Sequence, residues 1–97
     1  MDVQHFYNGL LFEWDRDKAR SNFKKHGVSF EEACEVFFDP LLQLWDAGDK
    51  EELTQAAIGE TELEHLLYVV HIVRAGDVIR IISARAVTAE ERREYEE

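Results

Sequence analysis

The chain has little that could cross-link it or hold it in a membrane. Its 97 residues include one cysteine, Cys34, and one proline. A lone cysteine excludes an internal disulfide and fits a reducing, cytoplasmic location. No apolar run approaches the roughly 20 residues that span a bilayer, and the polar opening Met1-Asp2-Val3-Gln4-His5 does not match a secretory signal. We therefore expect one small cytoplasmic domain over residues 1–97, with no membrane contact.

Motifs for metals, nucleotides and nucleophilic catalysis are also missing. The four histidines are scattered, without a His-Glu-x-x-His pattern or paired cysteines, so a zinc site is not expected. There is no glycine-rich phosphate loop and no nucleophile elbow. Cys34 lies on the apolar face of a predicted helix, which favours an inert core residue over a reactive thiol. The sequence predicts neither a metal nor a cofactor.

Positive charge is scarce. Eleven Lys and Arg residues face 21 Asp and Glu, a formal net charge of -10. This argues against a protein that coats nucleic acid, because such binding is driven by cations that displace counterions. It favours a basic partner or simple solubility. From Glu31 to Glu64 the only base is Lys50, and the other bases gather in residues 16–25, 74–85 and 92–93. These segments are either solvated faces or, if they meet, a basic cleft on an acidic body.

Capping patterns predict two helices near the start of the chain. Asp15 is placed to cap a helix over Arg16–Lys25, and Gly27 is placed to end it in the left-handed conformation. Ser29 and Glu32 form a capping box at the start of a second helix, Phe30–Phe38. The Asp-Pro pair that follows stops this helix.

The rest of the chain favours strands. The expected strands are Leu10–Trp14, Leu41–Trp45, Thr54–Ile58, Leu66–Val73 and Val78–Ala84. A polar turn is expected at residues 47–52, and Ala75-Gly76-Asp77 should join the last two strands as an antiparallel hairpin. A second capping box at Thr88 and Glu91 opens a short C-terminal helix. Because the helices group rather than alternate with strands, we predict an α+β fold, an antiparallel sheet packed on the two N-terminal helices.

Two arginines on the last strand need an explanation. Arg80 and Arg85 lie on a segment that should be largely buried, and burying an unpaired guanidinium is costly. Each has either a fixed acidic partner inside the fold or a position facing a cleft that receives an anion. The sequence leaves both alternatives open.

The neighbouring strand carries His71, whose face depends on the hairpin loop. Simple alternation sets Arg80 and Arg85 on opposite faces. A two-residue loop pairs His71 with Ile82 and puts it on the Arg80 face, whereas a three-residue loop pairs it with Ile81 and puts it on the Arg85 face. His71 is either a structural residue, in the core or at the edge of the sheet, or a functional residue.

The first helix ends in Lys24-Lys25-His26. These cations either interact with the helix dipole or take part in proton transfer and phosphate contact.

Taken together, the sequence resembles the BrnT family of toxins from type II toxin–antitoxin operons over roughly residues 11 to 97. Two blocks carry the resemblance and are specific as a pair: Lys25-His26-Gly27-Val28-Ser29-Phe30 and Arg80-Ile81-Ile82-Ser83-Ala84-Arg85. Further matching positions are Phe12-Glu13-Trp14-Asp15, Lys18-Ala19, Asn22, Glu31-Glu32-Ala33, Phe37, Asp39-Pro40, Ile58-Gly59, Val69-Val70-His71, Arg92-Arg93 and Tyr95-Glu96.

The resemblance implies a ribonuclease with a RelE-like fold that cleaves RNA without a metal and inhibits translation. It also implies silencing by a small basic DNA-binding antitoxin, BrnA, through which alone the toxin meets DNA. In the implied reaction the ribose 2′-hydroxyl attacks the neighbouring phosphate, a base takes its proton and cations stabilise the phosphorane. Arg85 and Arg80 would hold the phosphate. Lys25, His26 or His71 would serve as proton-transfer groups or electrophilic support.

The chain departs from the family pattern at two places. The family often has an arginine shortly before the Ile-Gly pair, where this chain has Glu52-Leu53-Thr54-Gln55, and a Gly-Arg pair where this chain has Glu64-His65. Both departures remove positive charge from a site for RNA, or shift more of the work onto His65. The alternative function is therefore a weak or inactive toxin-like module that acts only as an acidic binding partner.

Overall fold

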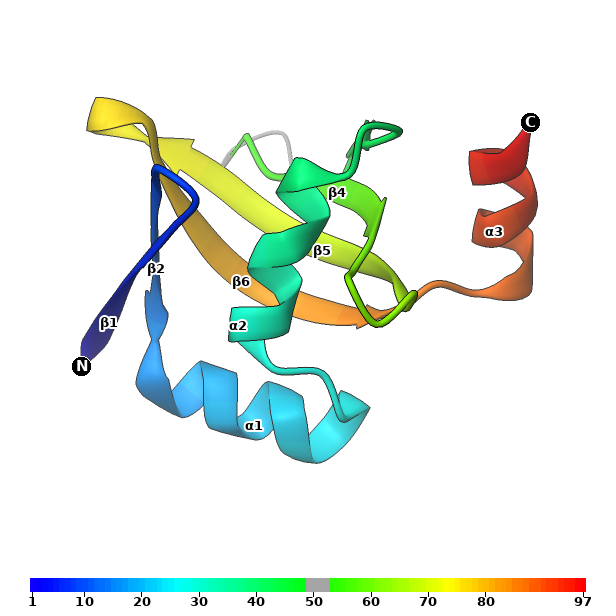
Figure 1. Ribbon diagram of the computed structural model, residues 1–97. Coiled ribbons are helices and arrows are strands. Elements are labelled where there is room, and N and C mark those ends of the chain that lie inside the picture. Colours follow the sequence, from blue (N-terminus) through cyan, green and yellow to red (C-terminus); the bar gives the residue numbers. More distant parts are fainter. Residues whose placement is uncertain (49–52) are drawn as a thin grey trace.

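A six-stranded sheet carries helices on both of its faces (Figure 1). The computed structural model describes residues 1–48 and 53–97, so most of the turn predicted at residues 47–52 lies outside the described residues. The elements in chain order are β1 (Asp2–Tyr7), β2 (Leu10–Asp15), α1 (Arg16–His26), α2 (Phe30–Ala33), the 3₁₀ helix η1 (Cys34–Phe38), β3 (Gln43–Asp46), β4 (Gln55–Glu60), β5 (Leu66–Arg74), the 3₁₀ turn η2 (Ala75–Asp77), β6 (Val78–Ala86) and α3 (Ala89–Glu96). The predicted α+β fold is confirmed.

The strand order is β1-β2-β6-β5-β4-β3. Every neighbouring pair is antiparallel except β2 and β6, which run parallel where Phe12 pairs with Ile79 and Glu13 with Arg80. The sheet is thus mixed, and this differs from the purely antiparallel sheet that the sequence predicts. A parallel pair needs a long crossover connection, and here the helices and the other strands supply it.

Strand β1 is the element that sequence reasoning missed. It pairs with β2 along its whole length through a turn at Asn8 and Gly9, whose φ angles are 48° and 85°. Two successive residues with positive φ are typical of a type I′ hairpin, and an Asn-Gly pair is the usual sequence signal for it. The polar character of the first five residues obscured this signal.

The helix caps follow the sequence closely. The Asp15 carboxylate accepts a hydrogen bond from the Lys18 amide at 3.0 Å, and Gly27 ends α1 with φ of 71°. Ser29 caps α2 by accepting from the Glu32 amide at 3.0 Å. The Glu32 side chain does not complete the predicted box, because it bonds elsewhere, as described below. The predicted helix 30–38 is in fact one α-helical turn followed by a 3₁₀ helix, which is common at helix ends.

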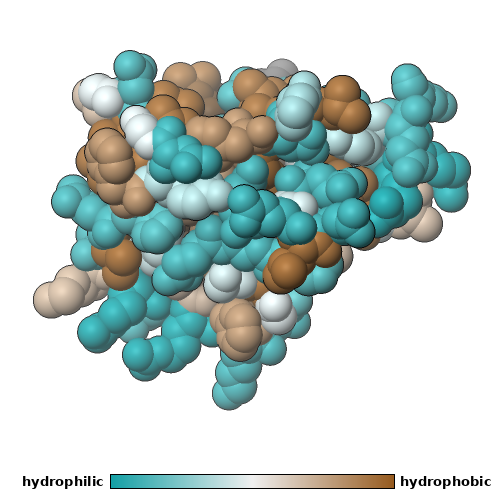
Figure 2. Space-filling model, viewed as in Figure 1, coloured by the Kyte–Doolittle hydropathy of each residue, from teal (hydrophilic) through white to brown (hydrophobic). Residues whose placement is uncertain are grey.

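The core lies on both faces of the sheet, since alternate residues of β4 and β5 point in opposite directions. One cluster packs beneath α1 and α2 and includes Phe12, Phe30, Ala57 and Val69. A smaller cluster on the opposite face includes Ile58 and is covered by Tyr95 of α3. Its other members are Ala56, Leu66, Trp45, Tyr68 and Val87. Space-filling colours show mostly hydrophilic side chains along the lower side of the molecule, where α1 lies (Figure 2).

A β-bulge decides which strand residues share a face. The three-residue connection pairs His71 with Ile81, as one of the two alternatives predicted, but Val70 pairs with Ser83, so Ile82 is an extra residue. Opposed residues share a face, and Ile72 opposes Arg80 while Tyr68 opposes Arg85. The predicted alternation is therefore wrong. Both arginines lie on the face away from α1 and α2, and His71 lies on the other face.

Candidate functional site

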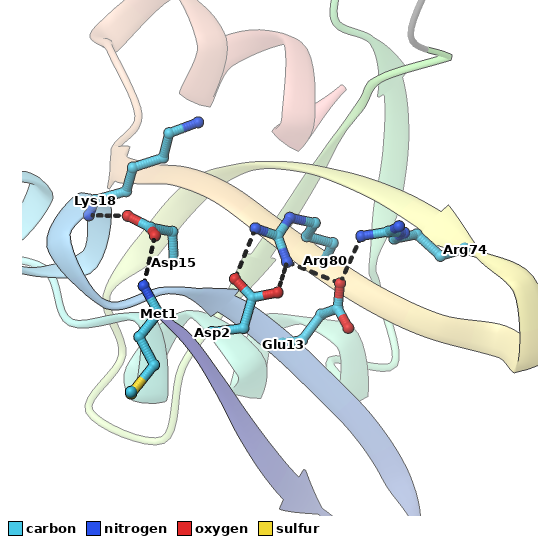
Figure 3. Close-up of polar contacts among 7 residues, drawn as sticks. All are labelled: Met1, Asp2, Glu13, Asp15, Lys18, Arg74 and Arg80. Carbon is cyan, nitrogen blue, oxygen red and sulfur yellow. Dashed lines mark hydrogen bonds and ion pairs between the residues drawn. The ribbon is translucent and has the colours of Figure 1, made fainter.

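Arg80 is the centre of an ion cluster (Figure 3). Its guanidinium donates to Glu13 at 2.8 Å and to both carboxylate oxygens of Asp2 at 3.1 Å. Arg74 donates to the same Glu13 oxygen at 3.0 Å. The hydrogen bonds that Arg80 donates to Asp2 and then to Glu13 raise its pKa above the usual value. For Arg80 the structure answers the question left open by the sequence, because two carboxylates balance its charge.

Arg85 also has an acidic partner, contributed by α3. Its two terminal nitrogens donate to the two Glu91 oxygens at 2.8 and 2.9 Å, and one of them also donates to the Ala86 carbonyl at 3.1 Å. The guanidinium carbon lies 4.1 Å from the centroid of the Tyr68 ring, a cation–π contact. The hydrogen bond from Arg85 lowers the pKa of Glu91. About a third of the Arg85 side chain, 33%, is exposed, so donors remain within reach of a ligand.

His71 is a core residue in this structure. It is 2% exposed, and its ring meets the Phe37 ring edge-on at 4.8 Å between centroids. Nδ1 lies 3.3 Å from the Val69 carbonyl oxygen, which can only accept, so Nδ1 is the donor. Burial lowers the pKa of His71, which leaves its imidazole neutral at neutral pH.

Lys25 and His26 are the two predicted site residues that the structure brings together. Both line a groove of about 350 Å³ between α1 and the middle of β6, which we call the basic groove. Its other lining residues are Asp17, Lys18, Ser21, Asn22, Ile82 and Ser83. Its floor is held by Asn22, whose side-chain amide bonds to both the carbonyl and the amide of Ala84 at 2.8 and 3.1 Å.

The basic groove lies along a helix that is rich in cations. Helix α1 carries five lysines and arginines and one acid, Asp17. Within residues 1–48 and 53–97, none of these five bases is part of an ion pair. Unpaired cations keep their full attraction for a polyanion. An acidic chain thus presents one basic helix, and a groove beside it.

A second hollow adjoins the basic groove, and sequence reasoning did not find it. We call it the histidine hollow; it also measures about 350 Å³ and shares His26 with the basic groove. His65, Glu32, Glu64, Val87 and Arg92 are among its lining residues. The Glu32 carboxylate accepts from Nδ1 of His65 at 2.7 Å and from the Thr61 hydroxyl at 2.9 Å. The sequence carried only a weak signal for this hollow. Glu32 belongs to the predicted capping box, and His65 lies where the chain departs from the family pattern.

The remaining candidates are inert in the described part of the chain. Cys34 is fully buried, its thiol donates to the Phe30 carbonyl at 3.2 Å, and burial raises its pKa to about 12. Among residues 1–48 and 53–97 there is no group of three side chains suited to hold a metal ion. In that same part of the chain, no helix has the length and apolar character needed to cross a membrane.

A mixed sheet with helices on both faces and a cationic groove beside the first helix define a small α+β protein suited to an anionic ligand. Comparison with known families gives it a class. Residues 14–91 match the model of the ribonuclease toxin BrnT of type II toxin–antitoxin systems, and the chain belongs to this family.

Comparison with solved structures supports the same family. The chain is similar to the crystal structure of the Brucella abortus ribonuclease toxin BrnT, with 25% sequence identity and a TM-score of 0.63. The match covers 77% of this chain and 92% of that one. No curated protein matches the chain.

Proposed function

We propose that this toxin is a metal-independent endoribonuclease that inhibits translation in the cytoplasm and is silenced by a basic DNA-binding antitoxin of the BrnA type. The observation that supports it most is the basic groove, where unpaired cations of α1 lie beside the middle of β6. RNA is the anionic polymer that a ribonuclease toxin must hold, and phosphate contacts supply most of the affinity for it. The RelE-like topology expected from the resemblance stays a prediction.

The proposed reaction needs no water and no metal. The ribose 2′-oxygen forms a bond to the adjacent phosphorus and gives its proton to a base, while the bond from phosphorus to the 5′-oxygen breaks and that oxygen takes a proton from an acid. The products are a 2′,3′-cyclic phosphate and a 5′-hydroxyl. Cations aimed at the phosphorane lower the barrier selectively, because the phosphorane carries more negative charge than the diester.

In this proposal the predicted site residues take unequal parts. Lys25 contacts the phosphate and His26 transfers a proton, since both line the basic groove. Arg85 contacts the phosphate from the sheet face that it shares with Ser83, another groove residue. Arg80 and His71 act through the fold, one in the ion cluster and the other in the core.

The experiment is RNA cleavage by purified, antitoxin-free protein in excess EDTA. We expect cleavage to persist with the chelator and to fall about 10- to 100-fold in Lys25→Ala, because a preorganised cation is lost. The matched control is Lys24→Ala, which removes an equal charge from the same helix outside the basic groove. Equal losses in the two variants would show that only overall charge matters.

The same assay tests the alternative function. A parent protein that does not cleave RNA, yet binds a basic partner tightly, is the acidic binding module. Four acids of residues 31–64 make this reading specific, because a hollow of about 280 Å³ is lined by Glu35, Asp39, Glu60 and Glu62. Burial, and then the charges of Glu62 and Glu35, raise the pKa of Tyr7 at its wall.

The acidic hollow also gives a prediction for the antitoxin. We expect the antitoxin to contact its rim, so association should slow by roughly tenfold between low and high salt, since rim charges act mainly on the association rate. Stopped-flow association at several salt concentrations measures this. Glu62→Gln should reduce the salt dependence, while Glu97→Gln, at the far C-terminus, should leave it unchanged. An association rate insensitive to salt contradicts the prediction.

A further inference from the structure

We propose that His65, held by Glu32, is the general base of the RNA cleavage reaction and that His26, across the histidine hollow, is the general acid. This inference rests on the proposed ribonuclease function and adds a catalytic residue and a positioning residue to it. It starts from a hollow that is lined by two histidines and an arginine, which come from the end of α1, the turn before β5 and α3.

The contact between His65 and Glu32 fixes one side of the imidazole. A carboxylate can only accept, so at 2.7 Å the Nδ1 atom of His65 is the donor. The lone pair is then on Nε2, the atom that the contact leaves unused. A carboxylate behind a histidine also stabilises the imidazolium that forms when Nε2 accepts a proton. This is the arrangement that a general base requires.

The surroundings hold this pair in place. The Glu32 side chain is 17% exposed, whereas the His65 side chain is 57% exposed. The carboxylate that anchors the pair is therefore largely buried, and the imidazole is open to solvent. Thr61 is buried, donates its hydroxyl to Glu32 at 2.9 Å and accepts from the His65 amide at 3.3 Å. The Thr61 amide donates to the His65 carbonyl at 2.9 Å. Thr61 thus fixes both members of the pair.

The backbone beside His65 is strained. Glu64 has φ of 65°, a left-handed conformation that a residue other than glycine adopts at a cost of about 1 kcal/mol or more. The 2.9 Å bond from the Glu64 amide to the Thr61 carbonyl maintains it. Residues held in such conformations cluster at active sites, and His65 directly follows Glu64 in the chain.

Of the other charged groups that line the hollow, Arg92 and His26 suit a phosphate, whereas Glu64 opposes one. Arg92 of α3 is about half exposed, and its acidic partner Glu96 is at 4.0 Å, so its guanidinium is available. His26 stands at the end of α1 and Glu64 in the turn before β5. In one turnover neutral His65 takes the 2′-hydroxyl proton and protonated His26 gives a proton to the 5′-oxygen. Exchange with solvent then restores both.

The test compares cleavage of one fluorescent RNA from about pH 5 to pH 9, where histidines titrate, for the parent and four variants. We expect His65→Gln to slow cleavage about 100-fold or more. Glu32→Gln keeps a hydrogen bond but loses the charge, so it should slow cleavage less and displace the limb of the pH profile that reports the base. His5→Gln, on β1 outside the hollow, is the matched control and should match the parent.

His65→Arg separates proton transfer from simple charge. If position 65 only needs a cation, as the family pattern of a Gly-Arg pair implies, this variant cleaves faster than the parent, and the proposal is overturned. If His65 is the base, it is as slow as His65→Gln. Binding of a 2′-O-methylated RNA, which cannot react, should stay within about twofold of the parent in His65→Gln, because a base acts on the rate and not on the affinity.

Two readouts keep this proposal distinct from the proposed function. A parent that does not cleave RNA overturns both, whereas a parent that cleaves and a folded His65→Gln that cleaves equally well overturn only the role of His65. Nitrogen NMR of the parent gives a readout independent of activity. We expect the neutral His65 ring to carry its proton on Nδ1, and a proton on Nε2 would contradict the proposal.

Discussion

Asn22→Ala is expected to lower the free energy of unfolding by about 2 to 4 kcal/mol, because it leaves buried backbone groups without partners. Asn22 is 8% exposed. Its Nδ2 donates to the carbonyls of Val28 at 3.1 Å and Ala84 at 2.8 Å, and its Oδ1 accepts from the Ala84 amide at 3.1 Å. The side chain therefore pairs with β6 as a neighbouring strand would. It does so at Ala84, beyond Ile79 and Arg80, where β2 pairs with β6.

Thermal unfolding measures this effect. Each kcal/mol corresponds to about 4 to 8 °C in the Tm of a domain of this size, so a fall of 10 °C or more is expected on that scale. Ser21→Ala, the exposed neighbour on the same helix, is the matched control and should leave the Tm nearly unchanged. Asn22→Asp keeps the acceptor but sets a carboxylate against two carbonyls, so it should be at least as damaging at neutral pH. An Asn22→Ala protein as stable as Ser21→Ala would contradict the argument.

The Asn22 contact also bears on activity. It fastens α1 to β6, and α1 presents Lys25 in the basic groove and His26 in both the basic groove and the histidine hollow. Catalytic groups displaced by about 1 Å lose rate by on the order of 100-fold. An Asn22 variant that still folds should therefore cleave RNA poorly.

Local signals explain which parts of the fold the sequence could predict. The caps of α1, α2 and α3 follow from single side chains, Asp15, Ser29 and Thr88, which satisfy nearby amides. The hairpin of β1 had an equally local signal in the Asn8-Gly9 turn, but the polar residues of β1 did not predict a strand. The β2–β6 pairing and the bulge at Ile82 join residues far apart in the chain. Local patterns contain no information about such register.

The candidate site was harder to predict, because the type of a side chain does not determine which residue it contacts in the fold. Arg80 was a reasonable phosphate ligand until β1 brought Asp2 beside it, and β1 was not predicted. Glu32 was assigned to the Ser29 cap, although its carboxylate reaches Thr61 and His65 instead. Lys25 and His26 stay predicted site residues, and only their place in the last turn of α1 could be predicted from the sequence.

Arg85→Ala is expected to abolish growth inhibition when the toxin is expressed in bacteria, while the protein still folds. The stability cost should be small, about 1 kcal/mol, since the Arg85–Glu91 pair is partly exposed and screened by solvent and the Tyr68 contact adds a similar amount. The loss of function should be large because a guanidinium that binds phosphate in two places has no substitute in alanine. Arg85→Lys keeps the charge but lacks the planar pair of donors of a guanidinium, so it should recover little of the toxicity.

Glu91→Gln decides whether Arg85 touches the phosphate or only fastens α3 to the sheet. Both variants break the charge pair, so a purely structural role predicts similar losses of toxicity and of Tm. A phosphate contact predicts opposite results, because without the Glu91 charge the Arg85 guanidinium is freer to bind an anion, and Glu91→Gln should cleave RNA at least as fast as the parent. Toxicity in cells with matched expression, RNA cleavage and Tm are measured for each variant. Undiminished toxicity in a well-expressed Arg85→Ala protein would remove Arg85 from the site and leave the phosphate to Lys25 and Arg92.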